Sequence, residues 1–117
     1  MHSGSPTPDT LAAINAHHDA LMAAVEQCGV SYLWLIGARA RGDDEPGADW
    51  DFMFAAWDYD TRQHERLEAK LSTIFGVAAS CLLVSHVVRE FTTEQAECVM
   101  KQAVQIVRAG RRITSTA

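Results

Sequence analysis

Cysteine is scarce in this chain, and its thiols form neither a disulfide framework nor a metal-binding pattern. The 117 residues contain three cysteines, Cys28, Cys81 and Cys98, and no two of them have C-x-x-C spacing. An odd, dispersed set argues against a disulfide-stapled secreted domain and favours reduced thiols in the cytoplasm. We expect each thiol to behave as a small buried apolar side chain.

Long apolar runs and an excess of positive charge are also lacking. No stretch approaches the roughly 20 apolar residues of a membrane-spanning helix, and the first eight residues lack the basic start and apolar core of a secretory signal. The formal net charge is −5, which argues against a domain that holds a long nucleic acid by general positive charge. We therefore expect a soluble cytoplasmic protein that makes no membrane contact and has no direct grip on nucleic acid. A small charged ligand held through a metal ion is compatible with this charge.

The composition is that of one small folded domain. Apolar residues make up 48% of the chain, enough for a hydrophobic core. The Ser-, Pro- and Gly-containing start predicts a disordered lead-in over residues 1–8. We expect one domain over residues 9–112 and a frayed tail over residues 113–117.

Hydrophobic periodicity predicts an α/β (α+β) fold. The predicted elements are a helix from residues 9–10 to 28–29, strands over 30–36, 49–57 and 79–84, a helix from 58–60 to 76, and a helix from 92–93 to about 109. The apolar face of the last helix includes Val107. This order of elements is typical of a small mixed β-sheet flanked by helices.

Two acids share one face of the second predicted strand. Because side chains alternate along a strand, Asp49 and Asp51 point to one side, while Trp50, Phe52 and Phe54 point to the other. The large apolar face is the core face, so the acids should sit together on the opposite side. Alternate positions lie about 6.6–7 Å apart. Two carboxylates so placed predict a site for Mg²⁺ (or Mn²⁺), an ion that leaves coordination positions for substrate phosphates.

The segment before these acids has the composition of a phosphate-binding connection. It leaves the first strand through the small residues Gly37 and Ala38 and continues with Arg39 and Arg41. A glycine turn lets backbone N–H groups approach a triphosphate closely. The arginines have two alternative roles: they can contact phosphate oxygens, or they can pair with the acidic run at residues 43–45.

The motif resembles that of a known family. Gly37–Ala38, ten residues and then Asp49-Trp50-Asp51 is similar to the Gly-Ser, about ten residues and Asp-x-Asp of the minimal nucleotidyltransferases (MNT), within the polymerase-β-like superfamily. The wider resemblance covers about residues 30–107, in element order more than in residue identity.

The resemblance implies a function and a site. Family members transfer a nucleoside monophosphate from a nucleoside triphosphate to an acceptor hydroxyl. Asp49 and Asp51 would then be the catalytic metal ligands, and Gly37, Ala38 and Arg39, together with Arg41, would bind the nucleotide. Many small members are the antitoxin of a toxin–antitoxin pair, so a HEPN-domain protein is the implied partner.

Two departures from the family pattern favour an alternative. Ala38 replaces the serine whose hydroxyl would contact phosphate, and residues 79–83 lack the third carboxylate that active relatives carry on a later strand. The nearest substitutes are Glu90 and His86. The alternative function is a catalytically degenerate nucleotidyltransferase fold that neutralises or scaffolds a protein partner. The acceptor, the nucleotide preference and the oligomeric state, including a homodimer, stay open.

Overall fold

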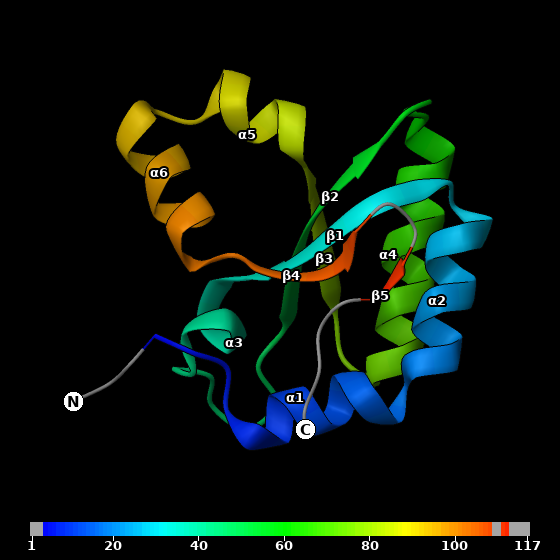
Figure 1. The fold of residues 1–117 in the computed structure, drawn as a ribbon, viewed down its shortest axis with the longest axis vertical. Coiled ribbons are helices and arrows are strands. Elements are labelled where there is room, and N and C mark those ends of the chain that lie inside the picture. Colours follow the sequence, from blue (N-terminus) through cyan, green and yellow to red (C-terminus); the bar gives the residue numbers. More distant parts are fainter. Residues whose placement is uncertain (1–3, 109–110, 113–117) are drawn as a thin grey trace.

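A mixed sheet forms the centre of the computed structural model, which describes residues 4–108 and the backbone of residues 111–112 (Figure 1). Its strands lie in the order β3-β2-β1-β4-β5. They are β1 (Val30–Ile36), β2 (Trp50–Ala56), β3 (Ala79–Leu83), β4 (Val104–Arg108) and β5 (Arg111–Arg112). β2 and β3 are parallel, and the other neighbouring pairs are antiparallel. The predicted α/β class with a small mixed sheet is confirmed.

Helices cover both faces of this sheet. They are α1 (Pro8–Ala16), α2 (His18–Gln27), α3 (Gly37–Arg41), α4 (Thr61–Phe75), α5 (Val84–Glu90) and α6 (Thr93–Gln102). Figure 1 shows α2 and α4 side by side against one face, and α5 and α6 on the other side. Each described helix is too short or too polar to cross a membrane.

The main core lies between the sheet and the pair α2 and α4. Phe52 and Phe54 of β2 are at most 2% exposed and belong to one cluster with Leu21, Leu67 and Leu71 from the helices. Burial of each such side chain contributes roughly 1.5–3 kcal/mol. The predicted core face of the second strand is therefore confirmed.

The opposite face of β2 is also partly covered. Met53, two residues after Asp51, is fully buried in a second cluster with Ile36 and Val87. Side chains from α6, including Val99, pack against this cluster. The sheet face that carries Asp51 is thus partly covered by α5 and α6, and it is not open to solvent along its whole length.

The first predicted helix is in fact two helices. His17, with φ −103° and ψ 24°, separates α1 from α2, and its ring meets Phe75 of α4 edge-on at 5.6 Å. The break lets Ile14 and Leu21 both reach the main core, where each is fully buried. Periodicity alone did not reveal it because the apolar spacing continues through both helices. α1 begins at Pro8, just before the predicted start at residues 9–10, and the Thr7 side chain caps it by accepting a hydrogen bond from the Thr10 N–H.

The prediction of the last helix is also wrong, because its residues after Gln102 are not helical. α6 ends there, Ala103 is extended, and Val104 begins β4, which pairs with β1. Ile106 and Val107 are fully buried in the main core. Valine and isoleucine pack well on a pleated sheet, and β4 covers an edge of β1 that would otherwise be unpaired. Residues 1–3 of the predicted lead-in and the predicted tail over 113–117 lie outside the described residues.

Polar side chains of α4 close the outer edge of β3. Ser72 Oγ accepts a hydrogen bond from the Ala79 N–H at 2.9 Å, and Glu68 Oε2 accepts one from the Cys81 N–H at 2.8 Å. His64 Nε2 lies 2.7 Å from the Cys81 carbonyl oxygen. These helix residues are four apart and therefore share one face of α4. They satisfy backbone groups that an open edge strand leaves unpaired.

Candidate active site

Strand register places the candidate site where β1 ends. Asp51 of β2 lies opposite Ile36, the last residue of β1, and opposite Ser80 of β3. Directly opposed residues point to the same face of a sheet. The turn at Gly37, the carboxylate of Asp51 and the hydroxyl of Ser80 thus come from three consecutive segments of the sheet.

Asp51 faces a cavity of about 660 Å³ between the sheet and the α5–α6 pair. This volume lies within the range of about 300–1,000 Å³ for small-molecule sites. On the sheet side the cavity is bordered by Gly37, Asp51 and Ser80, and α3 adds Arg41. The helical side is formed by Glu90, Phe91, Gln95, Cys98, Val99 and Gln102.

Gly37 fits directly against Asp51. Its φ is +75°, in the left-handed region, and a Cβ atom there would lie 2.7 Å from Asp51 Oδ2. A larger residue would be strained by its backbone conformation and would also collide with the carboxylate. The glycine therefore brings the turn backbone next to an acidic oxygen.

The charge of Asp51 is set by its surroundings. Burial raises its pKa above the ordinary value, the neighbouring Asp49 raises it further, and Arg41 lowers it. Asp49 was predicted to lie in the second strand, but it precedes β2 and is exposed. It does not line the cavity, yet it lies near enough to act on Asp51. A cation between the two carboxylates would offset their repulsion.

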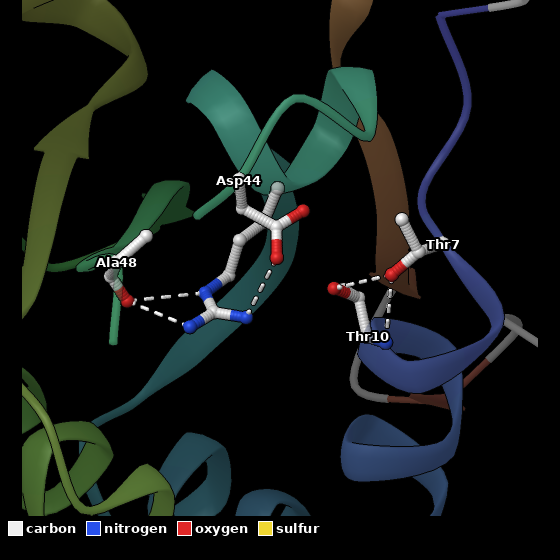
Figure 2. A network of polar contacts seen from close by, with 5 residues as sticks. Thr7, Thr10, Asp44 and Ala48 are labelled. Atoms are coloured by element: carbon white, nitrogen blue, oxygen red, sulfur yellow. Dashed lines mark hydrogen bonds and ion pairs between the residues drawn. The ribbon is translucent and has the colours of Figure 1, made fainter. Parts of the chain in front are cut away.

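Arg39 takes the ion-pair role, not a position in the cavity. Its guanidinium donates to the Ala48 carbonyl oxygen at 2.7 and 3.3 Å and to Asp44 Oδ2 at 3.3 Å (Figure 2). The same group lies 4.3 Å from the ring centroid of Trp50. Charge-assisted bonds and the cation–π contact hold the loop that leads into β2. Arg39 therefore supports the site indirectly, by holding the loop that leads into β2.

Arg41 takes the predicted ion-pair role and also lines the cavity. Its Nε donates to Asp43 Oδ2 at 2.9 Å, and its Nη1 donates to Gln102 Oε1 at 3.1 Å. The side chain lines the cavity and acts on the charge of Asp51. Ala38 does not line the cavity, and its carbonyl accepts a hydrogen bond from the Asp43 N–H at 2.9 Å. Of the four predicted nucleotide-binding residues, Gly37 and Arg41 are the two that reach the cavity.

Comparison with known proteins identifies the fold. No protein-family model matches the sequence, and no curated protein matches it. Among solved structures, one provisionally described as a minimal nucleotidyltransferase matches with a TM-score of 0.64 and 22% identity, over 80% of this chain and 93% of that chain. The chain has the minimal nucleotidyltransferase fold.

Two complexes with this fold are also similar. A toxin–antitoxin structure with AMP-PNP matches with a TM-score of 0.58 and 18% identity, over 74% of this chain and 69% of that chain. A tri-AMPylated Shewanella oneidensis HEPN toxin in complex with MNT antitoxin gives 0.53 and 16%, over 78% and 69% of the two chains. At these identities the likeness establishes the fold alone.

The structure shows which residue of β3 faces the cavity beside Asp51. Ser80 lines the cavity beside Asp51, whereas Cys81 is 3% exposed and belongs to the main core. Burial raises the pKa of the Cys81 thiol far above its ordinary value, so this thiol stays protonated. Because side chains alternate along a strand, the sequence places Ser80 and Cys81 on opposite faces, but it does not indicate which of them faces the cavity.

The other candidate residues from the sequence also differ in whether they line the cavity. Glu90 lines the cavity, and His86 lies elsewhere, with its ring 6.0 Å from that of Tyr59. Cys28 and Cys81 are buried as predicted, but Cys98 is exposed on α6 and lines the cavity. The prediction of a buried Cys98 is therefore wrong, because α6 buries Val99, its neighbour, against the sheet instead.

The acids at the cavity could supply part of a metal ion's coordination shell. Within residues 4–108, no three His, Cys, Asp or Glu side chains gather into a metal-binding group. Asp49 and Asp51 offer two carboxylates in electrostatic contact. Mg²⁺ is commonly held by one or two carboxylates, with substrate phosphates and water completing its shell. The residues therefore suit a site in which further ligands complete the coordination shell, and not a dedicated protein cage.

Proposed function

We propose that this protein is a Mg²⁺-dependent nucleotidyltransferase that transfers a nucleoside monophosphate from a nucleoside triphosphate to a hydroxyl acceptor. The observation that carries the proposal is the contact between Gly37 and Asp51 at a 660 Å³ cavity in a minimal nucleotidyltransferase fold. A close-packed glycine turn, an acidic oxygen and a free volume of this size are what a nucleoside triphosphate with its metal ion requires.

Each site residue has a distinct role in this proposal. Asp49 and Asp51 hold Mg²⁺ (or Mn²⁺), which, when bound, neutralises phosphate charge in the transition state. The Gly37 turn, with Ala38 next to it, admits the triphosphate to within reach of backbone N–H groups. Arg41 places a positive charge at the phosphate oxygens. Arg39 holds the loop that leads into β2 by donating a hydrogen bond to the Ala48 carbonyl oxygen.

The partner proposal is supported by the structural neighbours. One neighbour is an MNT antitoxin in complex with a tri-AMPylated HEPN toxin, and another toxin–antitoxin structure carries AMP-PNP. We propose that this chain likewise acts as the antitoxin of a HEPN-domain protein, that ATP is its nucleotide, and that the acceptor hydroxyl belongs to that partner. The free cysteines support a reducing cytoplasmic location. The domain boundaries at residues 9 and 112 and a homodimer stay predictions.

A binding module without turnover is the second candidate. It is favoured by the absence of a three-ligand metal group within residues 4–108 and by Ala38, which has no hydroxyl. In this alternative the same cavity binds a nucleotide, or the surface binds a partner, without transfer.

Transfer of a labelled nucleotide tests the proposal. The purified protein is incubated with a HEPN-domain protein as candidate partner, Mg²⁺ and ATP labelled at the α-phosphate. We expect label on the partner protein, and its loss with a metal chelator or in Asp51→Asn. Asp58→Asn, an exposed acid beyond the other end of β2, is the matched control and should keep full transfer. Binding of ATP without transfer would favour the second candidate, and absence of both would refute the proposal.

A further inference from the structure

Two acids face the cavity from opposite walls. Asp51 lies on the sheet side, and Glu90, the last residue of α5, lies on the helical side. The strand position beside Asp51, where a third carboxylate would adjoin the pair, is Ser80. A neutral serine hydroxyl is a poor proton acceptor near pH 7. The sheet therefore offers the Asp51 carboxylate to a metal ion but no general base.

Neighbouring polar side chains on the helical wall are already engaged. Gln95 accepts a hydrogen bond from the Thr92 N–H at 3.0 Å in a capping box. Gln102 accepts from Arg41 at 3.1 Å and donates to Cys98 Sγ at 3.4 Å. Within residues 4–108, the side chain of Glu90 takes part in no hydrogen bond or ion pair. Its carboxylate is free to accept a proton from a molecule in the cavity.

The remaining titratable groups fit this task less well. Cys98 lies on the same wall, but its Sγ already accepts a hydrogen bond from Gln102 at 3.4 Å. His86 is outside the cavity, near Tyr59. Asp51 is assigned to the metal ion, together with Asp49. Glu90 does not join these aspartates in a three-ligand group, so its carboxylate is separate from the metal site.

From this arrangement we infer that Glu90 is the general base of the proposed nucleotidyl transfer, the function on which this inference rests. The acceptor hydroxyl oxygen attacks the α-phosphorus and forms the new P–O bond. The bond between the α-phosphorus and the oxygen that bridges to the β-phosphate breaks, and pyrophosphate leaves with that electron pair. The hydroxyl proton passes to the Glu90 carboxylate. The base thus comes from a helix above the cavity and not from the strand beside Asp51.

Four proteins test this assignment: wild type, Glu90→Gln, Glu97→Gln and the double variant Glu90→Gln/Ser80→Asp. Glu97 is an exposed acid on α6 that does not line the cavity, so its variant is the matched control. Pyrophosphate release is measured with ATP and Mg²⁺, with N-acetyltyrosinamide as hydroxyl acceptor. Binding of Mg²⁺–ATP is measured separately by calorimetry, and thermal unfolding confirms that each variant is folded.

Loss of a general base should affect turnover and not binding. We expect Glu90→Gln to lower kcat by about 10²–10⁴-fold, with an unchanged Kd for Mg²⁺–ATP. Glu97→Gln should match wild type in both measurements. The double variant should regain at least about tenfold over Glu90→Gln, because Ser80→Asp places a carboxylate in the same cavity. A merely structural role for Glu90 predicts no such rescue.

The contrary outcomes are separable. Wild-type turnover in Glu90→Gln, or a loss that Ser80→Asp does not reverse, would overturn the assignment of the base. Binding of Mg²⁺–ATP by a wild type that releases no pyrophosphate would overturn it too, while nucleotide binding would stand. Neither binding nor release by the wild type would overturn the proposed function together with this inference.

Discussion

Asp51 Oδ2 lies 2.7 Å from the position that a Cβ atom on Gly37 would occupy. The carboxylate thus fills the space that every other residue at position 37 would need for its side chain. The left-handed backbone at Gly37 adds a second requirement for glycine, with φ at +75°. The turn and the acid are therefore one unit, and a change in either one should alter both the geometry and the charge of the cavity.

Replacement of Gly37 by alanine tests this unit against a matched glycine. Gly47 has a similar φ of +80°, but a Cβ atom there would meet nothing within 4 Å. Both Gly37→Ala and Gly47→Ala should lose about 1–2 kcal/mol from left-handed strain. Gly37→Ala should lose a further 1–3 kcal/mol, roughly the cost of overpacking, and should also lose Mg²⁺–ATP binding. Urea unfolding and calorimetry measure the two effects, and equal losses in both variants would contradict the close contact.

The pH dependence of stability should change in Asp51→Asn. Because burial and Asp49 raise the folded-state pKa of Asp51, its charged form opposes folding at neutral pH. Metal-free Asp51→Asn should therefore be more stable than wild type at pH 7. The advantage should fade as pH falls through the raised pKa toward the ordinary value of 3.8, since Asp51 then becomes neutral. Urea unfolding at several pH values in chelator measures this. A variant less stable than wild type at pH 7 would show a structural role for the charge.

Position 80, and not position 81, should accept a third carboxylate. Ala38→Ser combined with Ser80→Asp should raise pyrophosphate release above wild type, because the serine supplies a phosphate donor and the aspartate adds a base beside Asp51. Cys81→Asp should instead unfold the protein or destabilise it by several kcal/mol, roughly the cost of a buried unpaired carboxylate. Thermal unfolding and the release assay separate these outcomes. Equal tolerance at both positions would contradict the observed strand facing.

The edge of β3 should depend on Glu68. Glu68→Ala removes the carboxylate that accepts from the Cys81 N–H and should cost about 1–3 kcal/mol, the usual effect of a lost bond to a charged group. Glu68→Gln keeps an acceptor and should cost less. Glu65→Ala, at an exposed position of the same helix, is the control and should stay within about 0.5 kcal/mol. Equal urea midpoints for Glu68→Ala and Glu65→Ala would show that the edge contact is not stabilising.

The sequence predicted the elements whose pattern is local. The strand over residues 30–36 was predicted with its observed bounds, and the helix ending at Gly76 has the left-handed glycine cap that its sequence indicates. Residues 103–107 were predicted as helix because their spacing continues the apolar face of α6. They form β4 instead, since pairing with β1 gives Ile106 and Val107 a place in the main core. Pairing between strands that are far apart in the sequence does not alter the local spacing of apolar residues, so this spacing does not predict it.

The same distinction applies to the site. Alternation along the strand predicted which face of the sheet carries Asp51. The small residues after the first strand predicted a turn at Gly37. The role of Arg39 depends on the path of the loop, which brings the Ala48 carbonyl within 2.7 Å of its guanidinium. No sequence spacing encodes that path. The position of Glu90 above the cavity likewise depends on α5, an element that the sequence pattern did not reveal.

Calorimetric titration of the purified protein with ATP, with and without Mg²⁺, is the sharpest test of the proposed nucleotide site at Asp51. We expect binding that needs Mg²⁺, is lost in Asp51→Asn and persists in Asp58→Asn. Binding that is equally strong without Mg²⁺ or in Asp51→Asn, or no binding in any condition, would contradict it.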